Sequence, residues 1–210
     1  MMNKIKQILI AVAAIFMVQT ASAQVQIGGN ASYLKGTGDN DANLWGGGIN
    51  AKFFIGNRLA LGGGFRTFPT TKEDVSQNGS SKVRTTDALS QIYGSFDFLT
   101  SKKQSAIQPF VGVDAGVSIS NRTILITSGS NTVIDQKNKS TFFYLAPKAG
   151  LNIAVSPAFG LFGQASYGLT FGDGETVNIG QLPNPVETKP VDKFFIFDVG
   201  VYLRLTGAKK

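Results

Sequence analysis

Cysteine and histidine are both absent from the 210-residue chain. Without cysteine, the chain can form neither a disulfide nor a thiolate metal site. Without histidine, it lacks the commonest general base and metal ligand of proteins. The remaining Ser, Asp and Lys residues show no recognisable arrangement of a nucleophile with a base. The sequence therefore predicts a non-enzymatic protein that needs no cofactor and no metal.

A concentrated basic segment is also missing. The formal net charge is +7, and removing Lys4 and Lys6 with the N-terminal segment leaves +5, because 7 minus 2 is 5. The other basic residues are scattered along the chain instead of forming a stripe or a helix face. Nucleic acid is therefore not an expected partner.

Hydrophobic runs long enough for a membrane helix are lacking as well. The N-terminal apolar run from Ile8 to Val18 is too short to cross a bilayer core of about 30 Å as a helix. Lysines precede this run, and the small residues Ala21-Ser22-Ala23 follow it. This pattern predicts a cleaved signal peptide over residues 1–23, export from the cytoplasm, and one mature domain over residues 24–210.

What the chain does contain is alternation with a period of two residues, which is typical of strands. The alternating runs are separated by segments rich in Gly, Asn, Asp, Ser and Lys. The predicted strands are 25–34, 44–55, 59–68 and 86–99, followed by four more that begin at residues 107, 141, 159 and 193.

The connections between these strands alternate between long and short. The short ones are 56–58, 100–106 and 156–158, and the long ones are 35–43, 69–85, 120–140 and 172–192. Transmembrane barrels have short turns at one end and long external loops at the other. The rhythm predicts an all-β fold, a single antiparallel transmembrane β-barrel of about eight strands in up-and-down order.

Each predicted strand has one apolar face. In the last strand, Phe195 and the alternate residues to Leu205 are apolar, whereas the opposite face includes Asp198 and Arg204. The interior of an eight-stranded barrel is just wide enough for side chains, and long aromatic rows suit lipid. We therefore expect the apolar face to contact outer-membrane lipid. The alternative is a soluble periplasmic barrel that binds an apolar ligand inside.

Aromatic residues of the apolar face are predicted to gather at the two ends of the strands. Aromatic girdles at both membrane interfaces are typical of such barrels, although ordinary strand propensity also enriches aromatic residues. The residues expected near the long connections are Tyr33, Trp45, Phe171 and Phe195, and those expected at the opposite end are Phe53, Phe98 and Phe159.

Charged residues of the opposite face are predicted to fill the barrel interior as a structural polar network. Charges removed from water need partners, so opposite signs on facing strands are expected to form ion pairs. Asp114 and Lys148, in the middle of one hairpin, form the best single pair. An ion or proton path is the alternative. The predicted network comprises Lys52, Arg66, Asp97, Asp114, Lys148, Asp198 and Arg204.

The long connections 69–85 and 120–140 are expected outside the cell, where they could contact a protein partner. Within the second, 123–127 and 132–135 flank the turn-like segment 128–131, which predicts a hairpin. The hypothesis is a ribbon whose edge pairs with a partner strand by β-augmentation. Alternatively, the ribbon merely rigidifies the connection.

Three local features have structural interpretations. Pro147 falls inside a predicted strand and implies a bulge or a local break, because proline cannot donate a ladder hydrogen bond. The glycine clusters 46–48 and 62–64 are not followed by a helix start, so they indicate strand bending and close packing instead of phosphate binding. The acidic segments 39–41 and 173–175 match no complete calcium loop and are predicted to be solvated turns.

The signal peptide, the strand rhythm and the final strand from Phe195 to Leu205 together resemble the outer-membrane β-barrel domain family, of the OmpA/OmpX-type small eight-stranded barrel. The final strand looks like the one recognised by barrel-assembly machinery, although five residues, 206–210, follow Leu205. The resemblance implies an envelope scaffold or surface interaction protein of the bacterial outer membrane, without catalytic residues. The alternative function is a channel for ions or small solutes.

Overall fold

The computed structural model describes residues 24–37, 42–75, 81–102, 105–128, 131–172, 175–177, 186–188 and 192–205. The predicted signal peptide and the tail 206–210 lie outside the described residues. The acidic segment 39–41 also lies outside them, and only Glu175 of 173–175 is described. Among the described residues, no apolar helix is long enough to cross a bilayer.

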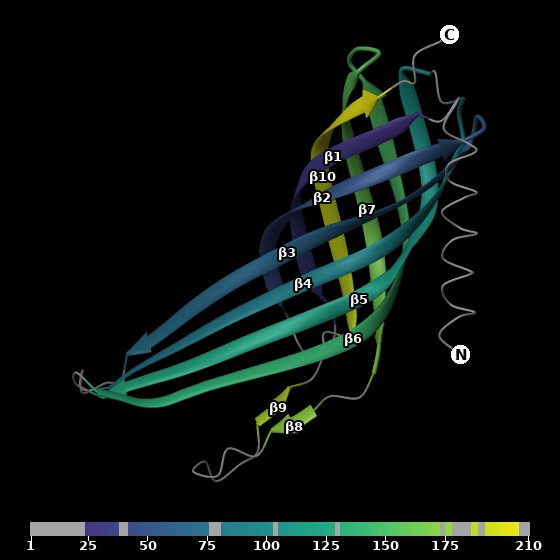
Figure 1. Cartoon of the computed structure of the whole chain (residues 1–210). Coiled ribbons are helices and arrows are strands. Elements are labelled where there is room, and N and C mark those ends of the chain that lie inside the picture. Colours follow the sequence, from purple (N-terminus) through teal and green to yellow (C-terminus); the bar gives the residue numbers. More distant parts are fainter. Residues whose placement is uncertain are drawn as a thin grey trace, which may run out of the picture.

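Eight antiparallel strands close into a barrel in the order β1-β10-β7-β6-β5-β4-β3-β2 (Figure 1). The predicted all-β up-and-down barrel is therefore confirmed. A short separate sheet, which the sequence did not predict, pairs β8 (Glu175–Val177) with β9 (Val186–Thr188). The barrel strands are β1 (Val25–Gly36), β2 (Asn43–Ile55), β3 (Leu59–Val75), β4 (Ser81–Leu99), β5 (Ile107–Ser128), β6 (Asn131–Ala154), β7 (Phe159–Phe171) and β10 (Lys193–Leu205).

The side-chain alternation of the strands separates a polar interior from an apolar exterior. In β10, Phe197 and Val199 are 46% and 69% exposed, whereas Asp198 between them is 1% exposed. The same alternation places Lys52 and Arg66 inside. The predicted outward orientation of the apolar face is confirmed. The soluble barrel with an apolar interior is wrong, because the charged face points inward.

Glycine on the inner face lets neighbouring strands curve tightly around the barrel. A Cβ atom built on Gly48 would collide with the backbone oxygen of Phe65 and would lie 2.9 Å from Cβ of Arg66. A methyl group therefore has no room between β2 and β3. The interpretation of the glycine clusters as sites of close packing agrees with this geometry.

Strands β3 to β6 continue far beyond the closed part of the barrel (Figure 1). The β2–β3 ladder ends at the pair Gly47 and Thr67, and the β6–β7 ladder ends at Phe143 and Phe171. Beyond these pairs, β3, β4, β5 and β6 remain hydrogen-bonded to one another. We call residues 68–75, 81–89, 120–128 and 131–142 the strand extension, and its end of the barrel the extension end.

The prediction that 69–85 and 120–140 are loops is wrong, because their described residues belong to the strands of the extension. The hairpin predicted within 120–140 is present, since Thr123 pairs with Lys137 and Ser128 pairs with Asn131. The matching pairs between β3 and β4 were not predicted. Ladder hydrogen bonds join backbone groups, so a strand can continue after its apolar alternation has ended.

Pro147 interrupts one ladder without shifting its register. The amide of Ala154 donates a hydrogen bond to the carbonyl oxygen of Ala106, on the side of β5. Because the amides of a strand alternate in direction, even-numbered amides of β6 point towards β5 and odd-numbered ones towards β7. Proline at position 147 has no amide hydrogen for this bond. The β6–β7 pairs are accordingly missing at residues 146 and 147, although the pairing with β5 continues. The predicted local break is confirmed, and no bulge forms there.

Candidate functional site

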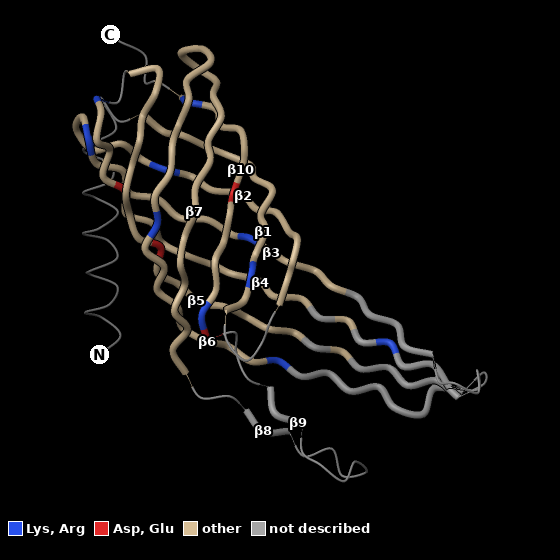
Figure 2. Tube along the Cα trace, turned by 180° about the vertical axis from the view of Figure 1, so that it is seen from behind, with Lys and Arg blue, Asp and Glu red and all other residues tan. Residues whose placement is uncertain are grey.

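A chain of alternating charges crosses the middle of the barrel interior. Nζ of Lys52 on β2 lies 2.6 Å from Oδ2 of Asp97 on β4. Nζ of Lys148 on β6 lies 2.9 Å from Oδ1 of Asp97 and 2.7 Å from Oδ1 of Asp114 on β5. Asp97 therefore joins two lysines, and the structure brings the predicted pair Asp114 and Lys148 into contact. Basic and acidic positions of these strands are marked in Figure 2.

Arg66 on β3 continues this chain across the barrel. Its Nη2 lies 2.8 Å from Oδ2 of Asp114, and its Nη1 lies 3.1 Å from Oδ2 of Asp198 on β10. The side chain of Arg66 is only 1% exposed. Because each end of the guanidinium contacts a different carboxylate, Arg66 ties one side of the barrel to the other. The three cations Lys52, Arg66 and Lys148 balance the three carboxylates Asp97, Asp114 and Asp198.

Neutral side chains add hydrogen bonds to the charged groups. Asp198 accepts hydrogen bonds from Ser32 and Asn30 of β1 and from Gln164 of β7. Lys148 donates to Oγ of Ser95 at 2.7 Å. Asn30, Ser32 and Ser95 were missing from the predicted network, although each stands at a polar position of an alternating strand. Buried charges are tolerated when they are both paired and hydrogen-bonded.

Arg204 lies in a separate part of the interior, towards the short turns. Its Nη2 donates to Oε1 of Gln108 at 3.1 Å. The guanidinium carbon lies 5.4 Å from the ring centres of both Phe54 and Tyr202. Such distances are typical of cation–π contacts. The seventh predicted network residue is therefore buried with an amide and two rings as neighbours.

Apolar layers close the interior on both sides of the charges. Towards the extension end, Phe68, Tyr144 and Phe194 pack in one buried cluster with Leu34, Tyr93, Ala146 and Ile196. Towards the short turns, Phe54 and Ala60 pack with Leu99 and Phe110. The ion pairs therefore lie between two side-chain layers, and the interior has the character of a filled core.

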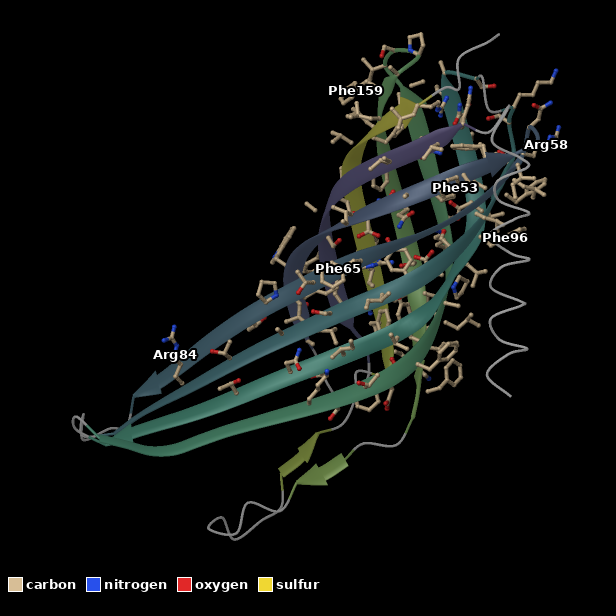
Figure 3. The ribbon with its side chains drawn as sticks, in the orientation of Figure 1. Phe53, Arg58, Phe65, Arg84, Phe96 and Phe159 are labelled. Atoms are coloured by element: carbon tan, nitrogen blue, oxygen red, sulfur yellow. The ribbon has the colours of Figure 1, made fainter. Side chains whose placement is uncertain are left out.

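The predicted interfacial aromatics all lie on strands of the barrel with their rings at least partly exposed. Tyr33 pairs with Trp45, and their ring centres are 4.8 Å apart. Phe53 and Phe159 lie towards the short-turn end, with Arg58, whereas Arg84 lies on the extension (Figure 3). The exposed fractions are 70% for Trp45, 50% for Phe171 and 36–39% for Phe53, Phe98, Phe159 and Phe195.

The extension has two open sheet edges. Among the strand pairs of the described residues, none joins a further strand to β3 beyond Thr67 or to β6 before Phe143. From Ile134 onwards, odd-numbered amides of β6 point towards this edge, as they do towards β7 within the barrel. The amide of Leu99 donates a hydrogen bond to the carbonyl oxygen of Arg58, so the backbone groups of even-numbered β3 residues point towards β4. The backbone groups of odd-numbered residues, including Pro69, therefore point towards the open edge. The β3 edge therefore lacks a donor at Pro69.

In the described part of the chain, no three His, Cys, Asp or Glu side chains are grouped so that they could hold a metal ion. The described residues of the predicted partner segments 69–85 and 120–140 belong to the extension.

No protein-family model and no curated protein sequence matches the chain. Solved structures do match it. The attachment invasion locus protein Ail of Yersinia pestis, in complex with the heparin analogue sucrose octasulfate, is 16% identical, with 88% of this chain and 98% of that chain covered and a TM-score of 0.52. A major outer membrane protein from Thermus thermophilus is 12% identical, with 88% and 100% covered and a TM-score of 0.53.

The fold is that of a small bacterial outer-membrane β-barrel. This agrees with the resemblance to the OmpA/OmpX-type barrel. The exterior supports the same conclusion independently, because a closed barrel satisfies its backbone hydrogen bonds in lipid and an apolar outer band matches the hydrocarbon. The apolar exterior and the fold place the chain in the bacterial outer membrane.

Proposed function

We propose that this outer-membrane barrel is a non-enzymatic surface interaction protein, in which a filled barrel holds the strand extension above the membrane. The observation that carries the proposal is the continuation of β3 to β6 beyond the barrel as a hydrogen-bonded sheet. A sheet of this kind offers backbone donors and acceptors that an envelope scaffold alone does not need. The extension is the interaction surface, and the barrel is its rigid anchor.

The interior supports anchoring in preference to transport. The ion pairs of Arg66 with Asp114 and Asp198 span the barrel, and buried aromatic layers lie above and below them. An ion that crossed the barrel would have to displace paired charges and packed rings. This geometry does not favour the channel alternative.

The open edge of β6 is the better of the two edges for β-augmentation. The register between β5 and β6 shifts between Ile126 and Thr127, so the alternation of the amides holds from Ile134 onwards. Residues 135–141 contain no proline, so each odd-numbered amide there can donate to an added strand. Lys139, at this edge, has an exposed side chain. Lysine on an open edge disfavours pairing of identical strands, since two copies bring like charges together. We therefore propose an extended segment of a different protein as the partner.

The experiment is crosslinking from a single cysteine, which the cysteine-free chain allows. Thr141→Cys, next to the edge, carries a photo-crosslinker attached from outside intact cells. The expected product is a discrete protein adduct. It should persist in the double variant Lys137→Ala and Lys139→Ala, which keeps the edge amides. It should disappear in Lys137→Pro and Lys139→Pro, which removes two of them.

Two outcomes contradict the proposal. One is a complete lack of protein adducts from position 141 on cells that display the folded barrel. The other is an adduct that both proline and alanine variants retain, because edge pairing then plays no part in the contact.

A further inference from the structure

An aromatic cluster covers the barrel on the side away from the extension. Trp45 on β2 packs against Tyr33 on β1, and Tyr33 pairs in turn with Phe197 on β10. Phe195 lies 6.3 Å from Phe197 and 4.9 Å from Tyr167 on β7, measured between ring centres. The cluster thus crosses four neighbouring strands on the lipid-facing surface. Tyr167 and Phe197 were not among the predicted interfacial aromatics.

Two lysines stand directly above this cluster. Lys35 pairs with Phe195 on one side and with Asn43 on the other. Lys193 is two residues from Phe195 on the same face of β10. Both side chains are exposed. Lys35 and Lys193 are therefore diagonal cross-strand neighbours, whose Cβ atoms are roughly 7 Å apart in such pairs.

The two lysines lie at the ends of their strands, next to the extension-end connections. β1 ends at Gly36 and β10 begins at Lys193, so both residues occupy the last outward-facing position before the extension-end connections. Below them the outward positions are aromatic or aliphatic. Asp192, the acidic neighbour of Lys193, precedes the first residue of β10 and is also exposed. The lysines thus mark the level at which lipid tails end and headgroups begin.

We propose that Lys35 and Lys193 bind the phosphate of an anionic lipid in the outer leaflet, with the aromatic cluster as the floor of the site. Two ammonium groups on flexible stems can both donate to one phosphate, and a charged donor and acceptor strengthen these hydrogen bonds. Lipid is the occupant because the aromatic floor is continuous with the lipid-facing surface. The rings contact the part of the lipid just below its phosphate, as aromatic residues do at membrane interfaces.

Trp45 is the only tryptophan of the chain and lies beside the site. It is two residues from Asn43, the cross-strand partner of Lys35, on the same face. Its fluorescence therefore reports which lipids reach these lysines. The full-length protein is folded into phosphatidylcholine vesicles that contain a small fraction of either brominated phosphatidylglycerol or brominated phosphatidylcholine. Bromine quenches tryptophan on contact.

The expected result is stronger quenching by the anionic brominated lipid than by the zwitterionic one at equal fraction. Each interfacial lysine enriches anionic lipid by about fivefold. The double variant Lys35→Gln and Lys193→Gln should remove the difference, whereas Lys35→Arg and Lys193→Arg should retain it. The matched control is Arg58→Gln and Lys102→Gln, which removes two exposed cations at the short-turn end and should leave the difference unchanged.

Equal quenching of the wild type by both lipids overturns the proposal. So does a preference for the anionic lipid that survives in the Lys35→Gln and Lys193→Gln variant, or one that the short-turn control abolishes. The last outcome means that the overall charge of the protein, and not a site at these two lysines, attracts the lipid.

Discussion

Nζ of Lys148 lies 2.7 Å from Oδ1 of Asp114, inside the barrel and between neighbouring strands of one hairpin. The two residues do not pair directly, because Lys148 stands opposite Gly112 and Asp114 opposite Ala146. The lysine side chain therefore reaches along the strand to its carboxylate. The same ammonium group also contacts Asp97, so one lysine neutralises two carboxylates.

Removal of one member of this pair should destabilise the barrel more than removal of both. Lys148→Met leaves Asp114 and Asp97 short of a cation in the interior, at an expected cost of about 3–5 kcal/mol in the free energy of unfolding. Adding Asp114→Asn should recover part of this loss. Urea unfolding in detergent or vesicles measures the four states of the double-mutant cycle. Additive effects of the two substitutions would contradict the ion pair, and Lys139→Met, at an exposed position, is the control.

The interior layers predict that the wild-type barrel does not conduct ions. In planar bilayers, the purified protein should show no stable unitary conductance, because packed rings such as Phe68 and Phe194 lie on the extension side of the ion pairs. Only folded protein is used, which is recognised because it migrates faster on a detergent gel before boiling than after it. Unfolded protein then cannot account for any conductance. Steady single-channel currents from this fraction would instead support the transport alternative.

Glycine should be essential on the inner face and replaceable on the outer face. Gly48→Ala forces a methyl group against the backbone oxygen of Phe65, and the strain should cost about 1–3 kcal/mol. Gly94→Ala is the matched substitution, since its nearest neighbour, the oxygen of Ala115, is 3.8 Å away. It should be neutral or stabilising by up to about 1 kcal/mol. Equal stabilities of the two variants by urea unfolding would contradict the packing argument.

The orientation of the barrel predicts which positions can be labelled from outside the cell. Lys139→Cys, on the extension, should react with a membrane-impermeant maleimide on intact cells. Arg58→Cys, in a short turn at the opposite end, should react only after the outer membrane is permeabilised. Both side chains are exposed, so a difference in labelling reports sidedness and not burial. Labelling of position 58 on intact cells, without labelling of position 139, would reverse the orientation.

The sequence determined the fold and the faces of the strands, because both follow from local alternation. Asp198 lies between Phe197 and Val199, and this pattern alone assigns the carboxylate to the polar face and the two apolar neighbours to the lipid. The charged residues of the interior could be predicted for the same reason, whereas the neutral residues Asn30, Ser32 and Ser95 that bond to them were missed. Each of the seven predicted charged residues is buried in the barrel.

The tertiary structure decided which charges meet. Arg66 contacts Asp198 of the last strand, far away in sequence, and this contact depends on closure and register of the whole barrel. It also decided where the strands end. Hydrogen bonds between backbones extend β3 to β6 through residues such as Lys72 and Lys137, a residue type that is depleted in strands. Lys35 and Lys193 come together through the β1–β10 pairing that closes the barrel, a contact between the first and last barrel strands that alternation along single strands does not encode.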